Sequence, residues 1–159
     1  MIYVGVDNGV SGSIGIVGDG TLVYVKMPVF KSLSYTRHTQ WINRVDVNGL
    51  MGVFSPYVGK ELKVVLERPL VNPMMFKATQ SAMRALEATL IVLEDLKFPY
   101  SYVDSKEWQK VLLPTGLKGS DLKKASLDIG KRLFPSIDFS GHSDADGLLL
   151  AEYARRVSK

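Results

Sequence analysis

The chain has 159 residues, of which 46% are hydrophobic and 23% charged, the size and balance of one globular domain spanning residues 1–159. This composition excludes a disordered chain and a collagen-like repeat, and the lack of cysteine excludes a disulfide framework, a zinc ribbon and a thiol nucleophile. A formal net charge of +4 favours polyanionic partners without requiring them.

The first residues of the chain give no sign of export. They reach Asp7 without a basic segment and are too short an apolar run for a secretory signal or a membrane span. We therefore expect a cytoplasmic protein that does not associate with membranes.

The first half of the sequence predicts mainly β-strands. Asp19-Gly20 is a strong hairpin turn signal, so the segments around it should pair as consecutive antiparallel strands, and Pro69 should end a central strand. The expected strands cover residues 2–6, 13–17, 21–26, 60–67 and 100–103. We interpret the segment 27–59 as helical, although Gly49 and Gly52 interrupt its apolar pattern.

The second half predicts mainly helices. Residues 76–97 carry apolar side chains close to the 3.6-residue period, and Asp104 with Glu107 forms a capping box for a short helix through residue 111. A loop is expected over 114–119, followed by helices over 121–134 and 143–157. This order of elements predicts an α/β domain with a mixed five-stranded sheet flanked by helices.

Two acidic residues end predicted strands. Asp7 follows the first apolar strand and Glu67 follows the fourth. If those strands are parallel neighbours, both carboxylates lie at the same edge of the sheet, where α/β proteins place their sites. Alternatively, Asp7 forms an Asx turn, and Glu67 pairs with Arg68 or a nearby lysine at the surface.

A third group of polar residues opens the final helix. His142, Ser143, Asp144 and Asp146 precede an apolar run, and Asp146 shares a helical stripe with residues 149, 150 and 153, so its side chain should face the sheet. A capping box formed by Ser143 and Asp146 is the structural alternative. Grouped together, these carboxylates would form an oxygen-rich site for Mg²⁺ or Mn²⁺, suited to two-metal phosphoryl transfer.

These motifs resemble those of RuvC-like Holliday junction resolvases of phages and some bacteria, over nearly the whole chain. The resembling blocks are residues 4–13, 64–69, 104–110, 124–135 and 142–156. The resemblance implies a ribonuclease H-like fold, a homodimer, and paired cuts in four-way DNA junctions that depend on Mg²⁺ or Mn²⁺, with two ions expected. A phage-encoded protein would act in the host cytoplasm.

The resemblance also implies the site residues. Asp7, Glu67 and Asp146 match the family's catalytic acids, whereas Ser143 stands where many relatives carry an acid or a histidine. The fourth metal ligand is therefore either Asp144 or His142, of which we expect Asp144 to matter more. In addition, Asn8 stands where relatives commonly have proline.

Basic residues outside the acidic group suit binding to a DNA backbone, although such runs are often only solvated helix faces. The candidates are Lys77, Arg84, Lys110, Lys118, Lys123 and Lys124. The apolar segment 73–76 either packs in the core or inserts Phe76 into an opened junction.

Three other functions fit parts of the pattern. The same site could cut other nucleic acids in a ribonuclease H-like nuclease, or the chain could bind junctions without catalysis. A sugar-kinase or actin-like ATPase needs two lobes, for which the chain is too short.

Overall fold

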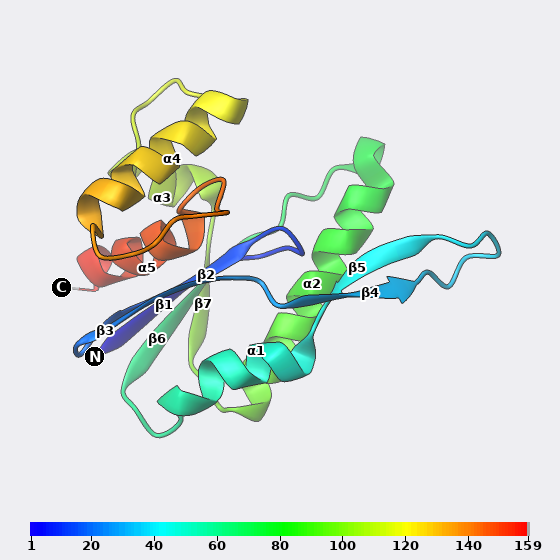
Figure 1. Ribbon diagram of the computed structural model, residues 1–159, viewed down its shortest axis with the longest axis horizontal. Coiled ribbons are helices and arrows are strands. Elements are labelled where there is room, and N and C mark those ends of the chain that lie inside the picture. Colours follow the sequence, from blue (N-terminus) through cyan, green and yellow to red (C-terminus); the bar gives the residue numbers. More distant parts are fainter. Residues whose placement is uncertain (159) are drawn as a thin grey trace.

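A mixed five-stranded sheet in the order β3-β2-β1-β6-β7 is the centre of residues 1–158, the part of the chain that the computed structural model describes (Figure 1). Its strands are β1 (Ile2–Asp7), β2 (Ser13–Gly18), β3 (Thr21–Lys26), β6 (Leu62–Glu67) and β7 (Tyr100–Val103). The first three pair antiparallel, and β1, β6 and β7 run parallel. The predicted sheet, including the parallel pairing of the first and fourth strands, is confirmed.

Helices cover both faces of this sheet (Figure 1). They are α1 (Val47–Phe54), α2 (Phe76–Asp95), α3 (Ser105–Leu112), α4 (Gly119–Leu133) and α5 (Asp146–Val157), with 3₁₀ turns η1 (Ser55–Tyr57) and η2 (Pro73–Met75). One core lies between the sheet and α1 with α2, and a second lies on the opposite face around α5.

The alternation of side chains along β1 determines which residues face which core. Ile2, Val4 and Val6 are buried in the core under α1 and α2. Because successive strand residues point to opposite faces, Gly5 and Asp7 point to the face that α5 covers. The same alternation in β6 sends Leu66 to the first core and Glu67 to the face of α5.

Helix α5 lies very close to the sheet because glycine is present at the contact. A Cβ at Gly5 would lie 2.2 Å from the backbone nitrogen of Ala151, a distance that no side chain can occupy. The helix is buried from Gly147 to Ala154, since the sheet covers one side of it and α3 and α4 pack on the other (Figure 1). This close approach brings the start of α5 to the end of β1.

The helical interpretation of residues 27–59 is wrong for most of that segment. Val29–Leu33 (β4) and Trp41–Val45 (β5) form a separate antiparallel hairpin, and only α1 and η1 are helical. The hairpin contains β-branched and aromatic residues such as Phe30, Trp41 and Ile42, which favour strands. That local preference outweighs the incomplete helical spacing.

Two predicted helix caps also differ from the structure. Helix α5 begins at Asp146 rather than at residue 143, so Ser143 is not its cap, and its hydroxyl instead donates to Asp144. Asp104 precedes α3 but makes no side-chain capping bond, because its carboxylate pairs with Arg68 at 3.0 Å.

None of the described helices combines the length and the apolar character needed to cross a bilayer.

Candidate metal centre

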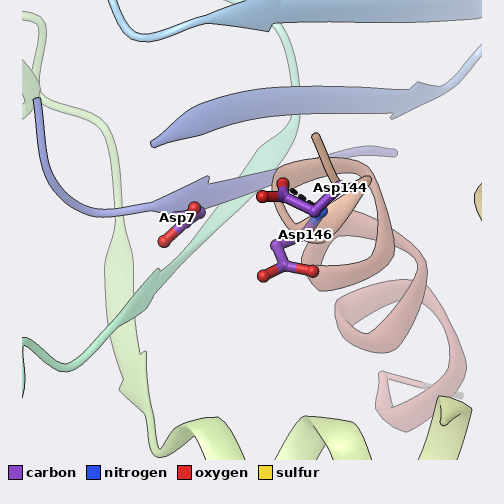
Figure 2. Close-up of side chains that lie close together, drawn as sticks. All are labelled: Asp7, Asp144 and Asp146. Carbon is purple, nitrogen blue, oxygen red and sulfur yellow. Dashed lines mark hydrogen bonds between the residues drawn. The ribbon is translucent and has the colours of Figure 1, made fainter. Parts of the chain in front are cut away.

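Three carboxylates meet at the carboxyl end of β1 (Figure 2). Asp7, Asp144 and Asp146 each offer an oxygen atom, and these atoms lie within 4.8 Å of one another. They line an open cleft of about 420 Å³, whose walls include the turn after β1, the start of α2 and Lys123 of α4. We call these three residues the acidic cluster.

The turn after β1 aims Asp7 into this cleft. The chain turns directly after the strand, and the Gly12 amide donates to the Gly9 carbonyl at 3.1 Å. A Cβ at Gly12 would lie 1.9 Å from the Asp7 carbonyl oxygen, so only glycine permits this path. The alternative role of Asp7 as an Asx-turn residue does not describe this turn, because its bond joins backbone groups and the Asp7 carboxylate faces the other acids.

Asp144 and Asp146 are held together just before the first turn of α5. The Asp146 amide donates to Asp144 Oδ1 at 3.3 Å, and the Ser143 hydroxyl donates to Asp144 Oδ2 at 3.0 Å. Lys123 Nζ lies 3.8 Å from the same Oδ2. Asp144, only 8% exposed, is therefore fixed by three neighbouring groups.

Buried hydroxyl groups orient the segment that carries Asp144 and Asp146, and no sequence motif marks them. Ser126 of α4 donates to Asp146 Oδ1 and accepts from the Ala145 amide at 3.0 Å. On the other side, the Tyr24 hydroxyl donates to the Asp144 carbonyl at 2.8 Å, and Ser13 Oγ accepts from the Gly147 amide at 3.1 Å. Only the packing of α4 and β2 against α5, with Tyr24 reaching over from β3, brings these groups together, and no local pattern marks them.

Glu67 lies beside Asp7 but outside the acidic cluster. Val6 and Leu66 are register partners, so the two acids follow adjacent positions of parallel strands. The indole nitrogen of Trp108, which is fully buried in α3, donates to Glu67 Oε1 at 3.2 Å. Arg68 pairs with Asp104 and not with Glu67, so the surface ion pair that the sequence left open is not formed. Glu67 lines a pocket next to the cleft, together with Asn8 and Arg68. No sequence motif marks Trp108 for its role as donor to Glu67.

Burial and nearby negative charges raise the pKa values of Asp7 and Asp146. Burial, together with the charges of Glu67, Asp146 and Asp144, raises the pKa of Asp7 well above its usual value. Burial raises the pKa of Asp146 to about 7, although the hydrogen bond from Ser126 opposes this rise. A site that gathers negative charge at such a cost is suited to a bound cation.

The donor atoms fit a hard divalent cation. All are carboxylate oxygens, the ligands that Mg²⁺ and Mn²⁺ prefer. The adjacent Asn8 donates its amide nitrogen to the Ala82 carbonyl at 3.4 Å, while its Oδ1 is buried without a partner among the described residues. This free acceptor at the cleft suits a water molecule held by such a cation.

His142 lies apart from the acidic cluster. Its ring stacks on Tyr24 with the centroids 4.2 Å apart, and burial and the nearby Lys26 lower its pKa. Of the two candidates for a fourth ligand, the structure thus brings Asp144, and not His142, to the other acids.

Of the predicted DNA-binding residues, Lys123 lines the cleft of the acidic cluster, whereas Lys77, Phe76 and Arg84 line a neighbouring groove. Lys77 and Arg84 are on α2, whereas Lys123 and Lys124 are on α4, and Lys110 and Lys118 are near the exposed loop that precedes α4. Phe76, at the start of α2, is 67% exposed. It is therefore not a core residue, the alternative that the sequence left open.

Comparisons with known proteins give a structural likeness and no sequence match. No protein-family model matches the chain, and no curated protein matches its sequence. The structure of Thermus thermophilus RuvC in complex with a Holliday junction substrate superposes with a TM-score of 0.63 at 12% identity, covering 99% of this chain and 96% of that one. A second T. thermophilus RuvC structure gives 0.59 at 16% identity, with 99% and 97% covered. The chain therefore has the RuvC-like, ribonuclease H-like fold that its motifs predict.

Proposed function

We propose that this protein is a metal-dependent endonuclease that resolves four-way or other branched DNA junctions by paired phosphodiester cuts. The observation that carries the proposal is the meeting of Asp7, Asp144 and Asp146 in one open cleft. The fold-level likeness to a RuvC bound to a Holliday junction supports it.

The acids divide into two overlapping groups of ligands. The acidic cluster would hold one Mg²⁺ or Mn²⁺, and Asp7 with Glu67 would hold a second. When bound, such ions activate a water molecule and stabilise the leaving oxygen of a phosphodiester. No nucleophilic side chain is then needed for hydrolysis.

The surrounding residues orient and balance the acids. Trp108 holds Glu67 by its indole N–H, and Ser126 holds Asp146 by its hydroxyl. Lys123, at the rim of the cleft, would pair with a phosphate of the DNA when the acids are occupied. Asn8 would accept a hydrogen bond from a water molecule in the cleft through its free Oδ1.

The DNA would lie across the cleft between two basic walls. Lys77 and Arg84 would contact its backbone from α2, and the lysines of the other wall are Lys110, Lys118, Lys123 and Lys124. The exposed Phe76 would insert between bases at the opened centre of a junction. Because paired cuts need two centres and the described residues form one acidic cluster, the active form would be a homodimer.

Cleavage and binding by an Asp7→Asn variant test the proposal. We expect wild type to cut a labelled four-way junction in Mg²⁺, and the variant to lose cleavage while it binds the junction in Ca²⁺ with nearly unchanged affinity. Asp128→Asn, a similar change at an exposed position of α4, serves as the control and should cut normally. Full-rate cutting by Asp7→Asn would refute the site.

The same assay distinguishes the alternatives. Wild type that binds the junction without cutting it in Mg²⁺ or Mn²⁺ would be a junction-binding protein, and equal cutting of RNA–DNA hybrids would indicate another nuclease specificity. Separate Asp144→Ala and His142→Ala variants identify the fourth ligand. We expect Asp144→Ala to lose activity at low Mg²⁺ and His142→Ala to keep most of it.

A further inference from the structure

The β4–β5 hairpin is a positively charged arm that projects from the sheet beside α2 (Figure 1). Its cations Lys31, Arg37 and Arg44 are all exposed, and the sequence has no acidic residue from 28 to 45. Lys31 and Arg44 lie on opposite faces of the hairpin, because Lys31 pairs with Asn43 and Arg44 with Phe30, and Arg37 lies in the loop between the strands. An arm that carries cations on both faces and no carboxylate suits a polyanion.

Hydrogen bonds close the hairpin at both ends and attach it to α2. The Asp46 amide donates to the Pro28 carbonyl at its base, and the Ser34 amide donates to the Gln40 carbonyl near its tip, at 2.9 and 2.7 Å. Gln80 of α2 donates to the Tyr35 hydroxyl at 3.4 Å, and β5 packs against the same helix. The arm thus has a defined position relative to α2.

A groove of about 300 Å³ separates the hairpin from α2. Tyr35, Thr36 and Gln40 line it from the hairpin, and Phe76, Lys77 and Arg84 line it from α2. No carboxylate occurs among the described residues that form its walls.

This groove continues into the cleft of the acidic cluster. Val10 and Ser81 line both spaces, so a chain lying in the groove would lead directly to the three acids. The groove beside the hairpin is therefore continuous with the proposed active site.

The exposed side chains of the hairpin match the chemistry of a nucleic-acid strand. Tyr35 is 79% and Trp41 63% exposed, and the Arg44 guanidinium lies 5.6 Å from the ring centroid of Phe30. Aromatic faces next to cations and amide groups are the usual means of binding a sugar-phosphate backbone and its bases.

We infer that the β4–β5 hairpin and α2 form a guide that holds one DNA strand of the branched substrate and directs it to the acidic cluster. This inference rests on the proposed nuclease function and adds a binding surface to it. Lys77 and Arg84 neutralise phosphates inside the groove, and Tyr35 contacts bases or sugars there. The hairpin cations Lys31, Arg37 and Arg44 lie outside the groove walls and neutralise phosphates of the strand before it enters.

Two charge-matched triple variants test the guide. The hairpin variant is Lys31→Gln, Arg37→Gln and Arg44→Gln, and the control is Lys60→Gln, Lys63→Gln and Lys97→Gln, which lie near the opposite end of the sheet where β6 and β7 begin. Both lose three positive charges. Binding of a fluorescent four-way junction is measured in Ca²⁺ by anisotropy over a series of salt concentrations, and the mass of each variant is measured by light scattering.

We expect the hairpin variant to bind about 10- to 100-fold more weakly than the control, and its slope of log affinity against log salt to fall by about 2–3. Equal affinities for the two variants would overturn the guide while leaving the nuclease proposal intact. A binding loss accompanied by a smaller particle mass would also overturn it, because the hairpin would then be a contact between two copies of the chain. Wild type that neither binds nor cuts branched DNA would instead refute the proposed function itself.

Discussion

Replacing Asp146 by asparagine should stabilise the protein when no divalent cation is bound. Burial raises the pKa of this carboxyl from 3.8 to about 7, so its ionised form is unfavourable in the folded chain. Asparagine has nearly the same shape but carries no charge, and its amide oxygen can still accept from Ser126. The variant therefore keeps the packing and removes the unfavourable charge.

The shift in pKa sets the size of the effect. At 1.36 kcal/mol per pKa unit, the ionised carboxylate costs up to about 4 kcal/mol of folding free energy above pH 7. Partial solvation of the cleft reduces the gain, so we expect about 2–4 kcal/mol. For a domain of this length that corresponds to a rise in Tm of roughly 5–10 °C.

The sign of the pH dependence follows from proton binding. In the unfolded chain the carboxyl titrates near its ordinary value, and in the folded chain near 7. Between these values the folded state binds more protons, so wild-type stability falls as the pH rises. At about pH 3 and below, the carboxyl is largely protonated in both the folded and the unfolded wild-type chain, and the advantage of the variant should nearly disappear.

Thermal unfolding in EDTA at pH 5, 6, 7 and 8 measures this difference. Asp146→Asn should gain stability over wild type steadily across the series, whereas the exposed control Asp128→Asn should differ by less than about 0.5 kcal/mol throughout. A variant that is less stable than wild type at pH 8, or whose advantage is the same at pH 5 and pH 8, would refute the electrostatic reasoning.

Three further predictions concern the site and its scaffold. Trp108→Phe removes the donor to Glu67 and should lower the cleavage rate about tenfold with junction affinity in Ca²⁺ unchanged; an unchanged rate would show that this hydrogen bond does not position the acid. Gly5→Ala places a Cβ against Ala151 and should lower the free energy of unfolding by at least about 3 kcal/mol in urea. The control Gly52→Ala has open space around its Cβ and should not lower it. Mg²⁺ at 100 times its Kd at pH 8 should add about 2.7 kcal/mol to the free energy of unfolding at that pH. The same Mg²⁺ concentration should add much less at pH 5, where protons compete for the ligands. Equal gains at both pH values in thermal unfolding would argue against carboxylate ligands.

The sheet and its acids could be predicted because their signals are local. Apolar runs ended by Asp7 and Glu67 identify two strand ends, and parallel pairing places those ends at one edge. The apolar run after Asp146 likewise identifies a helix that is buried. At these three residues the sequence motif, the predicted secondary structure and the place in the fold agree, and none of them requires knowledge of the tertiary structure.

The parts that were missed depend on contacts between distant segments. Ser126 and Trp108 are ordinary positions on amphipathic helices, and only the packing of α4 and α3 against α5 and the sheet brings them to the acids. The hairpin was missed because its apolar residues are largely exposed, so neither strand shows the burial pattern that a core-facing element has.

Because Asp144 and Asp146 lie at the start of α5, the acidic cluster can assemble only late in synthesis on the ribosome. Strand β1 is synthesised early, but the helix that covers one of its faces and carries Asp146 emerges only after every other element of the sheet. Until then, the nascent chain exposes an uncovered apolar surface and has no complete acidic cluster. If the cluster cuts nucleic acid as proposed, a partly translated chain would be unable to do so, because the folding step that completes the second core also assembles the cluster.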